Sequence, residues 1–361
     1  MGPRRLIALA TALAAATLAT ACQPVLNVLA LPTGPASAPV PVCQQLATAP
    51  SNSTVVIPAG DHAVGDCLIN GAGRTSVTVQ AQYTLNGPVS RLVGMFQCTD
   101  CNGWAFDGIH VLGDAPDPVD PAFTVRMVRG NSWRWTNCNV SNAQGPDGKP
   151  YGVRGLFATT GELRNFRIDH CTFHSNGTSR PTVSTNNYDH LLYLKDSTYR
   201  TGGIVGPGNV FHSNSWGAPV KLGFGLSQGA PVGINGVTFT GNRLYNNVSP
   251  DGICGVLVAG RSPNTTLTGN TIDCTASPTT HTRSALAIRS WVAGDKVTLT
   301  DNTVSGAHNA GATTGCGTPV AGAYDNTVTV SSHWPLADSW QVHPSGCSTN
   351  GIVTSRNTTT R

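Results

Sequence analysis

Hydrophobic and polar residues alternate with a period of two in short segments along most of the chain. Val237-Thr238-Phe239-Thr240 and Lys296-Val297-Thr298-Leu299-Thr300 are two examples. Such alternation in segments rich in Val, Thr, Ile and Phe is typical of β-strands. Gly, Asn, Asp and Pro stand between the segments and supply turns. The pattern predicts short strands joined by tight turns, and no stretch downstream of the apolar N-terminus shows the sustained period of a helix.

A four-residue phrase that ends in a hydrophobic residue returns along the chain, and its second position advances by 33, 38, 33, 28 and 32 residues. Self-similarity at a nearly fixed period indicates a solenoid, in which each repeat covers the apolar face of its neighbour. Three short strands in each repeat predict a parallel β-helix. The copies are Asn137-Cys138-Asn139-Val140, His170-Cys171-Thr172-Phe173, Gly208-Asn209-Val210-Phe211, Gly241-Asn242-Arg243-Leu244, Gly269-Asn270-Thr271-Ile272 and Asp301-Asn302-Thr303-Val304.

The second positions of the phrase should stack in one column, about 4.8 Å apart. Asn209, Asn242, Asn270 and Asn302 would then form a hydrogen-bonded ladder. In the two preceding coils the same column holds cysteines. Their expected Cα separation lies within the range for a disulfide, so we predict a Cys138–Cys171 bond.

The Gly-Asn-x-hydrophobic turns and the segment Tyr188-Asp189-His190-Leu191-Leu192-Tyr193-Leu194 resemble motifs of the right-handed parallel β-helix family, which includes pectate lyases. The resemblance covers roughly residues 90–330. It implies an all-β fold, a right-handed single-stranded solenoid with an N-terminal cap. It implies no single activity, because one fold hosts many functions.

The N-terminus has the form of a secretory signal, with Arg4 and Arg5 before an apolar run that is too short to span a membrane. We expect a signal peptide at 1–21, a Pro-rich tether at 22–42, a cap and first coil at 43–89, repeats at 90–330, and a C-terminal cap or extension at 331–361. Cys22 follows small residues and resembles a bacterial lipoprotein cleavage site; ordinary cleavage nearby is the alternative. Either way the protein would be secreted or lipid-anchored outside the bacterial cell membrane.

The chain has eleven cysteines, and lipidation of Cys22 would leave ten for disulfides in an oxidising compartment. Besides Cys138–Cys171, proximity in sequence suggests four further pairs. A zinc site at Cys98-x-x-Cys101 is an alternative, although no second pair at zinc spacing accompanies it. The four pairs are Cys43–Cys67, Cys98–Cys101, Cys254–Cys274 and Cys316–Cys347.

The first candidate catalytic residues lie on the strand that comes after the long loop at 175–190. A period of two turns Leu192 and Leu194 inward and Asp189, Tyr193 and Lys195 outward. In the next coil Lys221 should lie over Tyr193. The same alignment places Arg289 in the column of Lys195, and Arg126 in the column of Tyr193.

A cationic strip with one tyrosine suits an acidic polysaccharide, and β-elimination from a uronate needs a base, a proton donor and a group that neutralises the carboxylate. Lys195 or Lys221 would be the base, because a lysine beside other cations loses its proton more readily. Arg126 or Arg289 would neutralise the carboxylate, and Tyr193 or His190 would donate the proton. Asp189 and His212 are further candidates for binding substrate. Lyases of the resembling family commonly use Ca²⁺, but Asp169 and Asp189 alone supply too few oxygens.

Other interpretations remain open for this face. It could be a solvated sheet whose cations discourage aggregation, with His190 as a structural histidine. The protein could also be a non-catalytic glycan-binding or structural β-helix. Convergence of Tyr193, Lys195, Lys221 and Arg289 in a groove beside the 175–190 loop would favour an enzyme, and a flat arrangement would favour binding. A glycoside hydrolase is less favoured, since no closely placed aspartates are evident.

A second outward column should contain His174, His212, Tyr245 and Asp273, either as a metal or acid–base site or as ordinary surface. Trp133 and Trp135 share a face, and we expect them to fill the core rather than to stack on sugars. A net charge of +4 without a basic run argues against nucleic acid. We expect a monomer.

Overall fold

The structure, a computed structural model, describes residues 41–84, 87–88, 90–114, 123–145, 148, 150–153, 155–177, 189–195, 202–215, 217–223, 234–248, 253–259, 264–276, 284–289, 296–306, 309–314, 327–331, 340–343 and 352–354. Beyond Gly306, and at a few earlier strand positions such as Arg289, it describes only the backbone. The expected signal peptide, Cys22, Cys316 and Cys347 lie outside the described residues.

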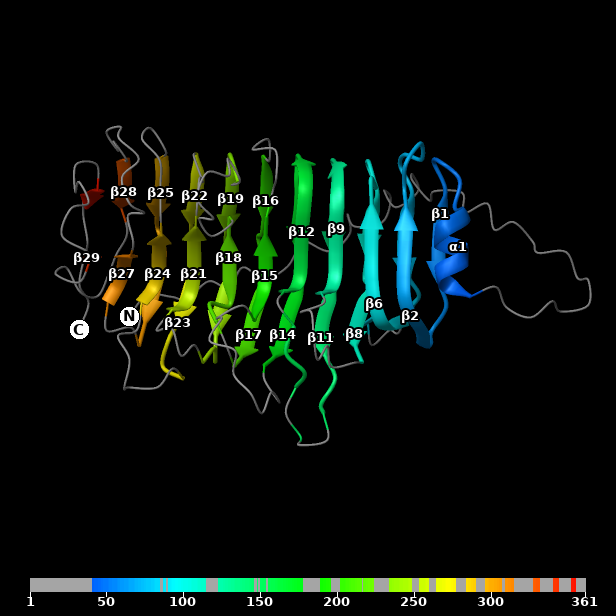
Figure 1. Ribbon diagram of the computed structural model, residues 1–361, viewed down its shortest axis with the longest axis horizontal. Helices are drawn as coiled ribbons and strands as arrows, with labels where there is room; N and C mark the ends of the chain where they lie inside the picture. Colours follow the sequence, from blue (N-terminus) through cyan, green and yellow to red (C-terminus); the bar gives the residue numbers. More distant parts are fainter. Residues whose placement is uncertain are drawn as a thin grey trace, which may run out of the picture. The chain divides into compact units, whose positions relative to one another are not determined.

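Parallel strands stack one per coil in three rows, as Figure 1 shows. We name each row after its strand in the coil β13–β14–β15. The β13 row is an 11-stranded sheet, and the β14 and β15 rows belong to one 17-stranded sheet.

The bounds of the strands are as follows. The β13 row consists of β1 (Thr54–Ile57), β3 (Thr78–Ala81), β7 (Ala105–Asp107), β10 (Arg134–Thr136), β13 (Phe166–Asp169), β16 (Gly203–Val205), β19 (Val237–Thr240), β22 (Thr265–Thr268), β25 (Lys296–Thr300), β28 (Thr327–Ser331) and β30 (Ile352–Thr354). The β14 row consists of β8 (His110–Gly113), β11 (Asn139–Asn142), β14 (Thr172–Asn176), β17 (Val210–Asn214), β20 (Arg243–Tyr245), β23 (Thr271–Asp273) and β26 (Thr303–Ser305). The β15 row consists of β2 (Gly60–Asn70), β6 (Ser90–Thr99), β9 (Phe123–Asn131), β12 (Gly155–Arg164), β15 (His190–Leu194), β18 (Val220–Leu222), β21 (Ile253–Ala259), β24 (Ser284–Arg289), β27 (Asn309–Thr314) and β29 (Trp340–His343).

Register keeps equivalent residues of successive coils opposite one another, as the repeated phrase predicts. Val140 pairs with Phe173, and Phe173 pairs with Phe211. All strand pairs within the rows are parallel. Antiparallel pairing in the described residues is limited to the short strands β4 (Tyr83–Thr84) and β5 (Gly87–Pro88) and to an isolated bridge between Gln144 and Pro150. The predicted all-β parallel β-helix is confirmed.

A short helix precedes the first coil. Helix α1 (Val42–Thr48) buries Val42 and Leu46. The Arg74 guanidinium donates to the carbonyl oxygens of Ala47 at 2.8 Å and Leu46 at 3.1 Å, which satisfies acceptors that every helix leaves open at its C-terminus. Through these two residues the helix packs against the hydrophobic core at this end of the solenoid.

Aromatic side chains fill the interior of the early coils. Trp133 and Trp135 are fully buried, which confirms the core interpretation for both. Trp135 stacks on Phe106 with ring centroids 4.4 Å apart, and Trp133 stacks on Phe166 at 4.9 Å. The side chains that alternate with these buried residues along each strand point outward, and the candidate site residues are expected among them.

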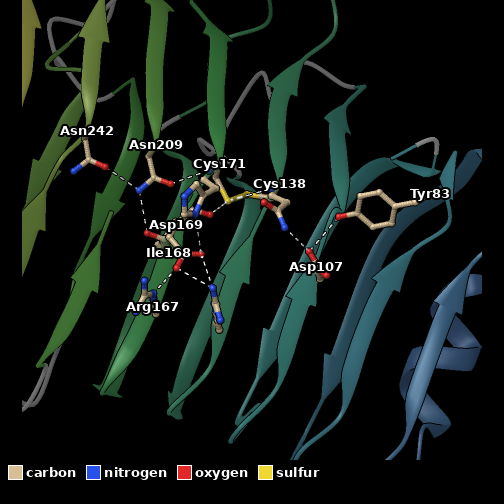
Figure 2. Close-up of polar contacts among 12 residues, drawn as sticks. Tyr83, Asp107, Cys138, Arg167, Ile168, Asp169, Cys171, Asn209 and Asn242 are labelled. Atoms are coloured by element: carbon tan, nitrogen blue, oxygen red, sulfur yellow. Dashed lines mark hydrogen bonds and ion pairs between the residues drawn. A yellow bond between two sulfur atoms is a disulfide. The ribbon is translucent and has the colours of Figure 1, made fainter. Parts of the chain in front are cut away.

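The asparagine ladder lies in the turn between the β13 and β14 rows, and Figure 2 shows its first members beside Cys171. Asn209 donates to Asn242 at 2.9 Å, Asn242 to Asn270 at 3.0 Å, and Asn270 to Asn302 at 2.8 Å. All four are buried, so the amides satisfy each other and the turn carbonyls. The predicted ladder is confirmed.

Four of the predicted disulfides are present: Cys43–Cys67, Cys98–Cys101, Cys138–Cys171 and Cys254–Cys274. The alternative of a zinc site at Cys98 and Cys101 is therefore wrong. Within the part of the chain that the structure describes, no helix is long and apolar enough to cross a membrane.

Candidate functional site

Four titratable residues gather where β15 begins and β18 passes beside it. We call Asp189, His190, Tyr193 and Lys221 the Tyr193 cluster. Tyr193 pairs with Lys221 in register, and the Lys221 Nζ lies 5.0 Å from the centre of the Tyr193 ring. The His190 ring meets the Tyr193 ring edge to face, with centroids 5.4 Å apart. The ammonium group thus lies over an electron-rich ring face, an arrangement that attracts cations.

The Tyr193 cluster is withdrawn from solvent although Asp189, Tyr193 and Lys221 have the outward parity of their strands. The exposed fractions are 1% for Asp189 and His190, 4% for Tyr193 and 7% for Lys221. Lysine and aspartate are almost never buried unless they are paired. The interpretation of this part of the face as a solvated sheet is therefore wrong, because strand parity gives a side chain's direction but not what covers it.

Backbone groups hold the start of β15 in place. The His190 Nδ1 lies 2.6 Å from the carbonyl oxygen of Ala218. A carbonyl only accepts, so Nδ1 carries a hydrogen, and in the neutral ring the basic lone pair belongs to Nε2. Asp189 packs against Gly152, where a Cβ would come within 2.6 Å of the carboxylate.

Two buried asparagines support the cluster and were not predicted. Asn176 donates to the carbonyl oxygen of His190 at 2.9 Å, and Asn214 donates to that of Asp189 at 3.1 Å. Each closes a repeated His-Ser-Asn triplet, at 174–176 and 212–214. This repetition was the signal that could have identified them.

Arg126 lies in the column of Tyr193, as expected. Register runs from Arg126 to Ala158 and from Ala158 to Tyr193, a distance of two coils or about 10 Å. The Arg126 guanidinium lies over the Phe123 ring, 5.1 Å from its centre. A ligand that reaches Tyr193 and extends along the axis would pass over Arg126.

The remaining predicted site residues are more dispersed. Lys195 follows the last residue of β15, and its backbone N–H donates to Thr159 at 2.9 Å. Arg289 shares its column but is three coils away through Gly223 and Ala259, about 14 Å along the axis. Arg289 therefore lies in the column of Lys195, as predicted, but well along the axis from Tyr193, which favours a flat arrangement over convergence in one groove. His212 lies in the β14 row, on another face.

The predicted histidine column is present on the β14 row. The rings of His174 and His212 stack 5.0 Å apart, and Tyr245 continues the stack at 5.0 Å. Burial, followed by repulsion from His212 and His110, lowers the pKa of His174 from 6.5 to about 4. Burial also lowers the pKa of His212. Both pKa values lie below 6.5, so the stacked rings are mainly uncharged at pH 7.

A polar hollow of about 310 Å³ opens where β6, β9 and β12 end. Each of its two arginines has its own acid: Arg129 pairs with Asp100 at 2.7 Å, and Arg164 pairs with Glu162. The hydrogen bond from Arg129 lowers the pKa of Asp100. The charges of the hollow cancel. It is lined by Asp100, Asn102, Arg129, Gly130, Asn131, Glu162 and Arg164.

The residues offered for Ca²⁺ do not fit such an ion. The carboxylate of Asp169, at the end of β13, is engaged by Arg134 and Arg167, whereas Asp189 precedes β15 in another row. Across the described residues, no three His, Cys, Asp or Glu side chains gather as metal ligands.

The family model described as "Right handed beta helix region" matches residues 56–272, more than half of the chain. The chain belongs to this right-handed β-helix family. The hand of the solenoid and the parallel stacking of its coils are thus family properties. No curated protein matches the sequence.

Solved structures with related folds differ widely in what they do. A PL6 alginate lyase in complex with a trisaccharide matches with a TM-score of 0.45 and 14% identity, over 80% of this chain and 56% of the lyase. The Dettilon tailspike protein matches with a TM-score of 0.41 and 13% identity, over 81% and 60%. PfbA, a surface adhesin of Streptococcus pneumoniae, matches with a TM-score of 0.43 and 10% identity, over 83% and 85%. This β-helix chain spans little more than half the length of the first two, and the likeness concerns the fold alone.

Proposed function

We propose that this protein is a polysaccharide lyase that cleaves a uronate-containing polysaccharide by β-elimination at the Tyr193 cluster. One observation carries the proposal. Two charged and two further titratable side chains are packed together away from water on the outward side of a rigid solenoid. Such clusters are characteristic of sites that do acid–base chemistry.

The reaction needs two proton transfers and no oxidant or reductant. A base removes the proton from the carbon next to the uronate carboxylate. The C–O bond on the neighbouring carbon then breaks as a C=C bond forms. An acid protonates the leaving oxygen, which becomes the new end of the shortened chain.

We assign the two proton transfers to Lys221 and Tyr193, and the binding of the acidic chain to Arg126. Lys221, once its ammonium group has lost a proton to solvent, takes the proton from the sugar. The Tyr193 hydroxyl, on the ring beneath Lys221, protonates the leaving oxygen. Arg126, in the same column but two coils from Tyr193, neutralises the carboxylate of a neighbouring sugar unit and so holds the acidic chain against the solenoid. The His190 ring contacts that of Tyr193 and positions it.

The second candidate is a non-catalytic glycan-binding β-helix. It is favoured by the small exposure of Tyr193 and Lys221, 4% and 7%, because a polymer must reach both side chains to be cleaved. A binding protein would need contact only with the outer surface of the solenoid. The two candidates differ in whether a new product forms.

We also propose that the protein is a secreted or lipid-anchored monomer outside the cytoplasm, with an acidic polysaccharide as its partner. Four disulfides among the described residues support an oxidising compartment. Mass spectrometry of the N-terminal peptide from cell envelopes tests the anchor. A diacylated Cys22 supports it, and an unmodified N-terminus downstream of Cys22 contradicts it.

The test of the activity is the ultraviolet absorbance of the unsaturated product. The protein without residues 1–22 is mixed with pectate, alginate, hyaluronan, chondroitin and glucuronan, with Ca²⁺ and with chelator. We expect absorbance to rise with at least one polymer, and Lys221→Met to slow it about 10²–10⁴-fold. Arg243→Gln removes an exposed cation from the β14 row and serves as the matched control. A flat trace on every polymer, together with measurable binding, would establish the second candidate instead.

A further inference from the structure

Two arginines face outward from adjacent coils of the β13 row, away from the Tyr193 cluster. Arg134 of β10 pairs in register with Arg167 of β13. Trp135 and Ile168, the next residues, are buried in the core, so the arginines point to the opposite side. Neighbouring strands lie about 4.8 Å apart, which brings two like charges close together.

One buried carboxylate holds both guanidinium groups. Asp169 has no exposed side-chain surface, and it accepts from the Arg134 Nη2 at 3.0 and 3.2 Å and from the Arg167 Nε. Figure 2 shows Asp169 beside Arg167. Burial by itself raises the pKa of Asp169, but hydrogen bonds from Thr136, Arg167 and Arg134 outweigh it and lower the pKa. The carboxylate therefore remains ionised and keeps the arginines in place.

The charges of this group do not cancel. In the polar hollow at the ends of β6, β9 and β12, and in the Arg91–Asp61 pair, each arginine forms an ion pair with a separate carboxylate. Here two arginines share Asp169, which leaves one net positive charge. The side chains of Arg134 and Arg167 are 48% and 43% exposed.

Hydrogen-bond donors are also left over. A guanidinium has five N–H groups. Within the described residues, Arg134 uses only its Nη2 and Arg167 only its Nε in hydrogen bonds. The remaining N–H donors of the two neighbouring guanidinium groups are available to a ligand. The planar array of donors in a guanidinium group matches the oxygens of a carboxylate or sulfate.

The backbone beneath the arginines is rigid. Cys138 and Cys171 are joined by a disulfide, and each directly follows the turn after its strand. Asn209 donates to the carbonyl oxygen of Ile168 at 2.9 Å and accepts from the Cys171 N–H at 2.9 Å. Little ordering would be needed on binding, because the receptor geometry already exists in the free protein.

We propose that Arg134 and Arg167 form an anion-binding site for an oxyanion carried by a polysaccharide, either a uronate carboxylate or a sulfate ester. The site lies on a different row from the Tyr193 cluster and does not depend on catalysis there. It would hold an acidic chain against the solenoid whether or not the protein cleaves that chain.

The test is affinity electrophoresis through gels that contain polygalacturonate, dextran sulfate or neutral dextran. We expect retardation by one or both anionic polymers and none by dextran; the two anionic gels distinguish carboxylate from sulfate. Arg134→Gln/Arg167→Gln should weaken binding about tenfold. Arg164→Gln, which removes an exposed arginine that has its own acid, should leave it unchanged.

A charge-balanced variant separates the site from net charge and from misfolding. Arg134→Gln/Asp169→Asn removes one cation and one anion, so the charge of the group is unchanged and no buried carboxylate loses its partner. If the paired guanidinium groups bind the oxyanion, this variant also binds about tenfold more weakly with an unchanged circular dichroism spectrum. Binding equal to that of the wild type in either double variant would overturn the proposal. In a Lys221→Met background the two double variants should weaken binding by the same factor as in the wild type, so loss of the lyase activity and loss of this site are separate results.

Discussion

The asparagine ladder should be a principal source of the solenoid's stability, and Asn242→Ala tests this. Asn242 is 2% exposed. Its side chain donates to the Val205 carbonyl oxygen and to Asn270, both at 3.0 Å, and accepts from Asn209 at 2.9 Å. Alanine removes all three hydrogen bonds and supplies no replacement.

The size of the destabilisation depends on which former partners of the Asn242 side chain keep another hydrogen bond. The Asn209 amide still donates to Ile168, and the Asn270 oxygen still accepts from the Asn242 backbone N–H. The Val205 carbonyl oxygen, by contrast, loses its hydrogen bond from the Asn242 side chain. A net loss of about 1 kcal/mol for each bond gives a destabilisation of about 3 kcal/mol.

Urea unfolding followed by tryptophan fluorescence measures this difference. Asn70→Ala is the control, because Asn70 is exposed and accepts one hydrogen bond, from the Ala72 N–H at 3.0 Å. We expect the control to cost less than about 1 kcal/mol. Equal losses for Asn242→Ala and Asn70→Ala would refute the reasoning, since the column would then add nothing beyond ordinary polar contacts.

Two further predictions concern other parts of the solenoid. Because the pKa of His174 is lowered to about 4 in the folded protein, the unfolded state binds more protons between pH 6.5 and pH 4. The free energy of unfolding should therefore fall by about 1 kcal/mol from pH 7 to pH 5, after allowance for the partial exposure of His174. Urea titrations of His174→Phe should show a weaker pH dependence of this free energy; an unchanged pH dependence would contradict the lowered pKa of His174. Gly206→Ala should cost about 3 kcal/mol or more, because a Cβ would lie 1.8 Å from the Thr240 carbonyl oxygen. Gly269→Ala, with no neighbour closer than 3.9 Å, should cost only about 1 kcal/mol, and equal thermal midpoints would show that the close approach is not limiting.

The repeated phrase was sufficient to predict the fold because it combines two independent constraints. Its first position requires a left-handed backbone, observed at Asn137, His170, Gly208 and Asp301. Its second position must hydrogen-bond within a buried column. Few folds need both of these residue types at a fixed spacing along the chain. One alignment of the phrase therefore predicted the rows of strands, the asparagine ladder and the Cys138–Cys171 bond.

The candidate site could be predicted only in part. Period-two parity correctly placed Lys221 over Tyr193 and Arg126 in the same column. It could not predict that the Tyr193 cluster is buried, since cover comes from residues distant in sequence such as Gly152 and Ala218.

The arginine pair was missed for a different reason. Arg134 and Arg167 each stand four residues before the second position of the phrase, at Cys138 and Cys171. Extending the alignment four residues upstream would have stacked them. Their shared carboxylate would still have been hidden, because Asp169 has outward parity and only the packing reveals its burial.

The measurement that most directly tests the proposed function is the mass of the oligosaccharides released from an acidic polysaccharide. β-Elimination leaves a C=C bond at the new end, so each fragment that carries this end is lighter by one water than the corresponding hydrolysis product. We expect the lighter species with the wild type and with Arg243→Gln, and neither species with Lys221→Met or Tyr193→Phe. Products that carry the added water, or lighter products that persist in both cluster variants, would contradict β-elimination at the Tyr193 cluster.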